Sequence, residues 1–184
     1  MEIELSAEAK DKRINRMVAL TVVVFSVTTG FGNIKDENLV QAMEEAQANS
    51  LDSWNEYQAT RLKLHVVETA RAQLVAGPQT AGVQKTIADF DKASGKYRDE
   101  SPKLMKQAQG YKAQYDAINT HDDQFDAAEA SLTTAISIAA VAALTESWVP
   151  LIAAWVIGGF GLFMTVCGFA GLGFHPDFLT SFFS

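Results

Sequence analysis

The sequence predicts an all-α integral membrane protein, with three transmembrane helices and an extramembrane antiparallel coiled-coil helical hairpin. Residues 131–174 carry a single acidic or basic residue, Glu146, which stands beside a Trp-Val-Pro sequence. This pattern indicates two apolar helices joined by a tight turn, because a membrane-spanning helix needs about 20 mostly apolar residues. The middle of the chain is instead rich in Ala, Glu, Gln and Lys and poor in Pro, which favours long polar helices.

Composition and motifs exclude several classes of function. A formal net charge of −7 argues against nucleic acid as a partner, since phosphate binding needs a basic surface. The single cysteine, Cys167, excludes an internal disulfide and a cysteine-built metal site, and we expect it to pack as a small apolar side chain. The sequence contains no Gly-rich phosphate loop, no H-E-x-x-H and no G-x-S-x-G. We therefore expect a protein that is not an enzyme and that has no cofactor.

The first apolar segment follows a polar N-terminal segment, residues 1–16, which is basic towards its end. Residues 17–34 reach about 27 Å as a helix, close to the roughly 30 Å hydrocarbon core of a bilayer. A basic stretch before a short apolar run is also typical of a secretory signal peptide. We favour a first transmembrane helix, because a helix-forming sequence follows and no clear small-x-small cleavage site is present.

Residues 35–130 predict the extramembrane hairpin. Two sets of side chains recur at alternating spacings of four and three, as in the seam of a coiled coil. The first set is Leu39, Met43, Ala46, Ser50, Ser53, Tyr57, Thr60, Leu64, Val67, Arg71 and Leu74, and the second is Leu104, Ala108, Tyr111, Tyr115, Ile118, Asp122, Phe125, Glu129 and Leu132. Gly77 and Pro78 predict a turn near residues 77–82. Ser101 and Pro102 predict a break near residues 101–102, with Ser101 as the N-cap of a new helix.

Two further transmembrane helices are expected at residues 131–146 and 149–174. The first of them is short and made mostly of small residues. It can therefore span only if some of residues 127–130 enter the interface, or if neighbouring helices shield it. The apolar tail, residues 175–184, is expected at the membrane interface. The basic residues before the first span place the N-terminus in the cytoplasm, which predicts a multi-pass protein of the bacterial inner membrane with its hairpin outside.

Two short motifs in the polar region resemble a known family. The residues that form them are Trp54, Tyr57, Gln58, Ala59 and Lys63, as W-x-x-Y-Q-A-x-x-x-K, and His121, Asp122, Phe125, Asp126, Ala128 and Glu129, as H-D-x-x-F-D-x-A-E. With one apolar segment in front and two behind, they resemble an uncharacterised bacterial family of three-span membrane proteins, domain of unknown function 4337. The resemblance covers residues from about Ala19 to about Gly171 and implies three spans, a coiled-coil hairpin and no assigned activity. Glu146 departs from the pattern, because basic residues commonly follow the second span in that family.

Three carboxylates form the only candidate metal site. Asp122, Asp126 and Glu129 lie on one helix face, four and then three residues apart, and hard divalent cations bind carboxylate oxygens. The alternative is that Asp122 and Glu129 are polar positions of the helical seam, paired with basic residues such as Lys35 or with another subunit. We favour this alternative and predict no metal site.

Aromatic residues and glycines are the candidate interaction residues. The aromatic set and its neighbouring amide are expected to pack between helical arms or between subunits, and the glycines to allow close helix crossings. They are Trp54, Tyr57, Gln58, Tyr111, Tyr115 and Phe125, and Gly158, Gly161, Gly168 and Gly171.

These features favour a non-enzymatic structural or assembly protein of the lipid bilayer, either a homo-oligomer or an accessory subunit of a larger membrane complex. The first alternative is an oligomeric passive channel or mechanically gated pore, lined by Ser and Thr residues of the first two spans. A divalent-cation-binding sensor built on the three carboxylates is the second alternative.

Overall fold

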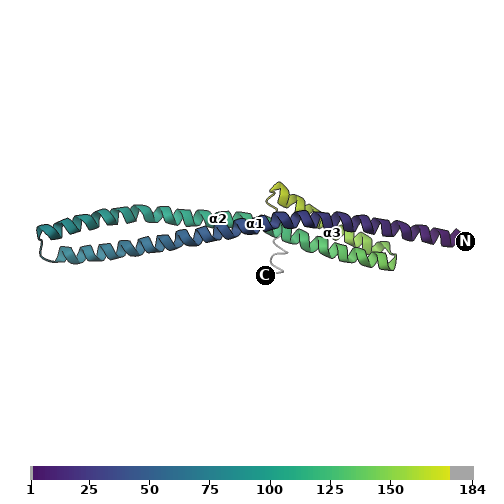
Figure 1. Cartoon of the computed structure of the whole chain (residues 1–184), viewed down its shortest axis with the longest axis horizontal. Helices are drawn as coiled ribbons and strands as arrows, with labels where there is room; N and C mark the ends of the chain where they lie inside the picture. Colours follow the sequence, from purple (N-terminus) through teal and green to yellow (C-terminus); the bar gives the residue numbers. More distant parts are fainter. Residues whose placement is uncertain (1, 175–184) are drawn as a thin grey trace. The chain divides into compact units, whose positions relative to one another are not determined.

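The computed structural model describes residues 2–174, and describes side chains from Lys12 onward. The elements are α1 (Glu2–Ala76), α2 (Ala81–Thr145) and α3 (Trp148–Ala170), and the described residues contain no strand (Figure 1). All three helices are long and apolar enough to cross a membrane. The expected interfacial tail, residues 175–184, lies outside the described residues.

The chain divides into two compact units, which we name by the helices they contain. The three-helix unit combines the part of α1 up to Ala42 with the part of α2 from Ala117 and with α3. The two-helix unit is Met43–Asp116, which holds the remaining parts of α1 and α2 and the turn between them. The expected hairpin is therefore divided between the two units.

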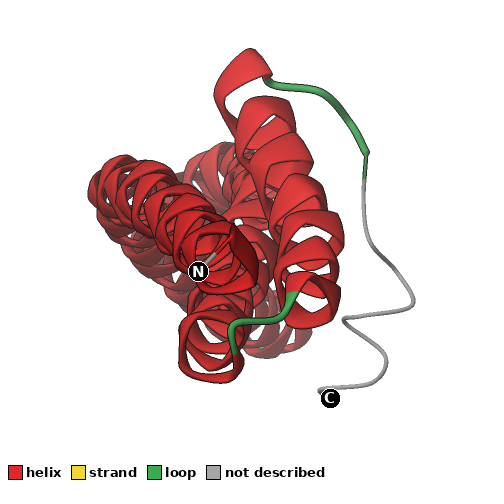
Figure 2. Cartoon of the chain, turned by 90° about the vertical axis from the view of Figure 1, so that its right-hand side faces the viewer, coloured by secondary structure: helices red, strands yellow, loops and turns green. Residues whose placement is uncertain are grey.

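The core of the three-helix unit is made of small and medium apolar side chains from all three helices, which lie side by side in Figure 2. From α2 it takes mainly alanines, which let the neighbouring helices approach closely. The fully buried members of this core are Ile14, Ala135, Ala139, Ala142, Leu151 and Ala154. Neighbouring helices therefore pack closely around the short apolar end of α2, which is one of the two arrangements expected for it.

The outer surface of the same unit is also apolar. Exposed side chains include Leu20, Val23, Val27, Phe31 and Ile34 of α1, Val141 and Leu144 of α2, and Ile152, Val156, Phe163 and Val166 of α3. An apolar surface of this extent is unfavourable in water, whereas hydrocarbon tails solvate it at no cost. The unit is apolar both inside and outside, as expected for helices surrounded by lipid.

The turn between α2 and α3 is compact, and Ser147 makes hydrogen bonds to the ends of both helices. Glu146 adopts a left-handed conformation with φ of 50°, and the Ser147 N–H donates to the carbonyl oxygen of Ala142 (3.2 Å), as in a Schellman motif. The Ser147 hydroxyl then accepts from the Val149 N–H at the start of α3. At its other end α3 stops at Ala170, earlier than the expected residue 174, because Gly171 takes the left-handed conformation that terminates the helix.

The two-helix unit consists of two antiparallel arms joined by residues 77–80. The Gln79 side-chain amide donates to the carbonyl oxygens of Leu74 and Val75 at the end of α1 and of Gly77 in the turn. The Thr80 hydroxyl accepts a hydrogen bond from the Val83 N–H at the start of α2. The predicted seam positions within this unit are all buried or half-buried. The 3–4 spacing of the sequence therefore identified the faces that the two arms turn towards each other.

The expected break near residues 101–102 is absent, because α2 continues through Pro102. Ser101 does not cap a new helix: it is 5% exposed, and its hydroxyl donates to the carbonyl oxygen of Tyr97 (2.7 Å) within the same helix. Proline removes one backbone hydrogen bond and normally costs a helix about 3 kcal/mol. Leu104, two residues beyond the proline, is buried against the other arm, and this packing favours a continuous helix.

Candidate functional site

A cluster of carboxyl groups joins α1 to α2 in the three-helix unit, just beyond the apolar segment of α1. The carboxyl groups of Asp36 on α1 and Asp122 on α2 face each other, close enough to hydrogen-bond when one of them is protonated. Oδ1 of each group is buried without a hydrogen-bond partner. Asp126 and Glu129 follow on α2, and Glu129 accepts a hydrogen bond from the Asn33 amide (3.3 Å). Asp36 was not among the candidate residues, and it occupies the place expected for Lys35.

The electrostatics of this cluster favour a bound proton. Desolvation first, and then the negative charges of Asp122 and Asp126, raise the pKa of Asp36 from 3.8 to about 7. The pKa of Asp122 is also raised, mainly by burial, although the hydrogen bond from Asp36 opposes this shift. At Asp126, partial desolvation and then the neighbouring carboxylates raise the pKa. The arrangement is a pair of neighbouring carboxyl groups that favours retention of a proton, because burial raises the pKa of both.

The three candidate metal ligands therefore have different partners. Asp122 faces Asp36, Glu129 is exposed and binds Asn33, and Asp126 lies between them on the helix. Among the side chains that the structure describes, residues 12–174, no three His, Cys, Asp or Glu converge in an arrangement that could hold a metal ion. The expected pairing of Asp122 or Glu129 with Lys35 is not found either, because Asp36 occupies this position.

A buried glutamine next to this cluster was missed by the sequence analysis. Gln124 is fully buried, and its amide nitrogen donates to the carbonyl oxygens of Leu172 (2.7 Å) and Phe174. Its amide oxygen lies 3.1 Å from Nδ1 of His121. Gln124 thus fixes the chain that leaves α3 against α2, and only the tertiary structure identifies this role.

Three of the four candidate glycines lie where α3 contacts the other two helices. A Cβ atom at Gly158 would lie 2.2 Å from the Phe25 ring of α1, and one at Gly161 would lie 2.8 Å from Cγ of Leu132 of α2. At Gly168 the nearest atoms belong to Phe125, at 2.7 Å. These glycines form close contacts within one chain. The fourth, Gly171, ends the helix instead.

The aromatic candidates fall into two groups. Phe125 is 3% exposed and packs edge-on against Phe169 of α3, with ring centroids 5.2 Å apart. In the two-helix unit, Trp54 stacks on Tyr57 at 5.2 Å and remains 42% exposed, while Gln58 is exposed. Tyr111 and Tyr115 are half-buried. Of the aromatic candidates, therefore, Trp54 presents most surface to a partner.

A tryptophan and a threonine also join α3 to α1 within the apolar region. The indole N–H of Trp155 donates to the Thr21 hydroxyl (2.9 Å), and the Trp148 ring lies 6.4 Å from that of Trp155. The Arg13 guanidinium lies 5.9 Å from the Trp148 ring, as in a cation–π contact. The basic segment before the first apolar run and the turn between α2 and α3 thus lie at the same end of the three-helix unit.

The hydroxyl groups proposed to line a pore include several that bond their own helix. Thr28 donates to the carbonyl oxygen of Val24, Thr29 to that of Phe25, and Ser137 to that of Thr133. These hydroxyls are satisfied without water, so their polarity alone is not a sign of an aqueous lumen.

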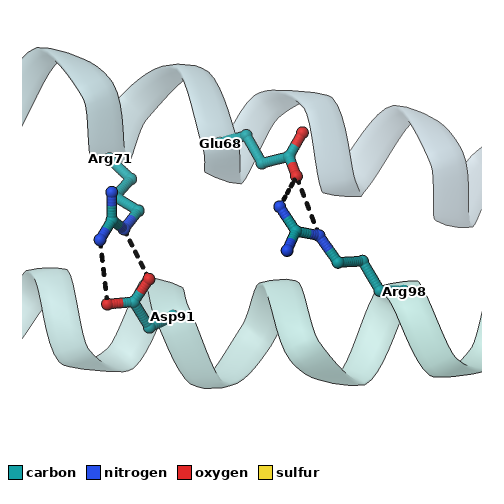
Figure 3. Close-up of polar contacts among 4 residues, drawn as sticks. All are labelled: Glu68, Arg71, Asp91 and Arg98. Atoms are coloured by element: carbon teal, nitrogen blue, oxygen red, sulfur yellow. Dashed lines mark hydrogen bonds and ion pairs between the residues drawn. The ribbon is translucent and has the colours of Figure 1, made fainter.

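The charged depression of the two-helix unit is occupied by its own ion pairs (Figure 3). Arg71 donates to both carboxylate oxygens of Asp91, and Arg98 donates to Glu68 through two nitrogens, with the shortest N–O distance 2.5 Å in each pair. The hydrogen bond from Arg98 lowers the pKa of Glu68. Because both guanidinium groups are paired with carboxylates, the depression offers no unpaired cation to an anionic ligand.

Comparison with known families gives one match. The family model described as "Domain of unknown function (DUF4337)" matches residues 14–171, which includes most of the three helices. No curated protein and no solved structure matches the chain significantly.

Proposed function

Since the chain belongs to the DUF4337 family, whose description names no activity, we propose from its geometry that it is a structural or assembly protein of a membrane. The three-helix unit is the membrane anchor, and the two-helix unit is an extramembrane coiled coil that binds a protein partner. On this proposal the protein is a homo-oligomer or an accessory subunit of a larger complex. It is not an enzyme.

The observation that carries the proposal is the apolar outer surface of the three-helix unit. Large side chains such as Phe31, Leu144 and Val156 are 64–86% exposed on three different helices. Lipid would cover this surface, and the polar two-helix unit would remain in water. The carboxyl pair of Asp36 and Asp122 would then lie near the membrane boundary, where an ionisable group can reach water.

The native mass of the assembly tests this proposal. We expect protein extracted with a mild detergent to run at an integer multiple of 20.0 kDa, or to migrate with other chains at a fixed ratio. The same sample in a dissociating detergent serves as the control and should give the single chain. A single, partner-free chain after mild extraction from fresh membranes would contradict an assembly role. A ring of four or more copies that conducts ions would instead support the pore alternative.

A further inference from the structure

The two-helix unit carries opposite charges on its two arms at the same level. Residues 44–56 of α1 contain four acidic residues and no basic one, namely Glu44, Glu45, Asp52 and Glu56. Residues 102–114 of α2 contain three basic residues and no acidic one, namely Lys103, Lys106 and Lys112. The Ser50 hydroxyl donates to the carbonyl oxygen of Ala108 (3.1 Å), so these two stretches lie side by side.

These charges do not neutralise each other within the chain. All seven side chains are exposed. In the described two-helix unit, the ion pairs are Arg71–Asp91, Arg98–Glu68 and Lys112–Asp116, so Lys112 alone among the seven has a partner. The others lie outside the seam, where their side chains point away from the opposite arm.

Apolar side chains are exposed beside the acidic residues. Leu51 is 56% exposed and Trp54 is 42% exposed, and both lie within the acidic stretch of α1. Further along α1, Leu62 and Val66 are also exposed, at 65% and 59%. An aromatic residue and aliphatic residues bordered by charges have the composition of a protein interface.

We propose that this surface binds a second copy of the same chain, with the acidic face of α1 packed against the lysine face of α2 in the neighbouring copy. The inference rests on the proposed function, and it identifies the partner of the two-helix unit as another copy of the chain. Copies inserted in one membrane share one orientation, so rotation about the membrane normal keeps each residue at its own level. The acidic stretch of one copy then meets the basic stretch of the next, whereas two acidic faces would repel each other.

Cysteine cross-linking tests which faces meet. In the full-length chain with Cys167→Ala, one tagged copy carries Asp52→Cys and a differently tagged copy carries Lys106→Cys. We expect a disulfide between the two tags after mild oxidation in membranes. Two copies that both carry Asp52→Cys are the matched control and should cross-link at least tenfold less. A preference for the Asp52–Asp52 pair would overturn the proposal.

Charge exchange provides the second test. Glu45→Lys with Asp52→Lys, or Lys103→Glu with Lys106→Glu, should each reduce the fraction of assembled protein several-fold at low salt. All four substitutions in one chain should restore assembly, because the two faces are again complementary. Assembly that is unchanged in every variant would overturn the proposal.

The outcomes separate this inference from the proposed function. If the wild-type chain assembles but the Asp52–Lys106 pair does not cross-link, only the contact proposed here is wrong. If the chain migrates with another protein and its copies do not touch, the conclusion is the same: the contact proposed here is wrong, but the proposed function stands. If the wild-type chain forms no assembly, the proposed function fails as well.

Discussion

At the scale of single residues, the chemically unusual feature is the pair of neighbouring carboxyl groups of Asp36 and Asp122, both with raised pKa. Its effect on stability has a definite sign. The folded chain retains a proton on Asp36 up to about pH 7, whereas the unfolded chain loses it near pH 3.8. The folded state therefore binds more protons between these values, and the free energy of unfolding falls as the pH rises through this range.

We expect Asp36→Asn to remove this pH dependence, because an amide can donate to Asp122 without titrating. The variant should gain stability relative to the wild type as the pH rises from 5 to 8, by about 1–2 kcal/mol after allowance for solvent screening of a partly exposed pair. Thermal unfolding in detergent at both pH values measures the difference. Glu37→Gln, which removes an exposed carboxylate beside the pair, is the control and should keep the wild-type pH dependence. Equal pH dependence in the Asp36→Asn variant would show that the pair does not hold a proton.

The sequence did not predict this pair: it placed Lys35 opposite Asp122, one residue away from Asp36. Counting equal numbers of residues from the turn at 77–80 places Asp122 level with Lys35. Neighbouring residues on a helix point about 100° apart, so an error of one residue replaces a basic partner with an acidic one. The role of Gln124 was unpredictable for a different reason, since its carbonyl partners lie 48 and 50 residues away along the chain.

At the scale of helices, the packing of α3 depends on which glycines face its neighbours. The sequence prediction named Gly161 and left out Gly159, but it could not say which helix Gly161 meets, because that depends on how α3 is rotated. The structure places Gly161 against Leu132 and the carbonyl oxygen of Ala128, whereas nothing lies within 4 Å of a Cβ at Gly159. Pro102 in α2 is a second example. The Ser-Pro pair predicted the start of a new helix, but α2 continues through it and its neighbours Ser101 and Leu104 are buried.

Alanine substitution at these two glycines is a matched test of that rotation. We expect Gly161→Ala to lower the free energy of unfolding by about 1–3 kcal/mol, because the Ala128 backbone cannot move away from the added methyl group. Gly159→Ala should leave stability unchanged or slightly higher, since alanine is the better helix former. Unfolding in mixed micelles with increasing dodecyl sulfate measures both. Equal losses at the two positions would mean that α3 presents a different face to α2.

At the scale of the whole molecule, the pattern of apolar and polar segments predicted the three helices. Their apolar runs and the polar turn residues are local properties of the chain, so no tertiary information was needed. The prediction of which side of the membrane each end occupies depends instead on a few basic residues that flank the first apolar segment. Here the structure adds that Arg13 and Trp148 are in contact, so the N-terminal basic segment shares one end of the three-helix unit with the turn at Glu146. The Asp36–Asp122 pair lies beyond the opposite ends of the apolar segments of α1 and α2.

This arrangement predicts that the turn at Glu146 and the two-helix unit lie on opposite sides of the membrane. In the Cys167→Ala background, we expect Lys85→Cys to react with a membrane-impermeant maleimide from outside the cell. Glu146→Cys should react only in inverted vesicles, because positive residues before a first apolar run favour the cytoplasmic side for that end of the unit. Detergent-solubilised samples, in which both cysteines react, control for accessibility. Labelling of both sites from the same side would mean that α2 does not cross the membrane, and the apolar outer surface of the three-helix unit would then have to be covered by protein rather than by lipid.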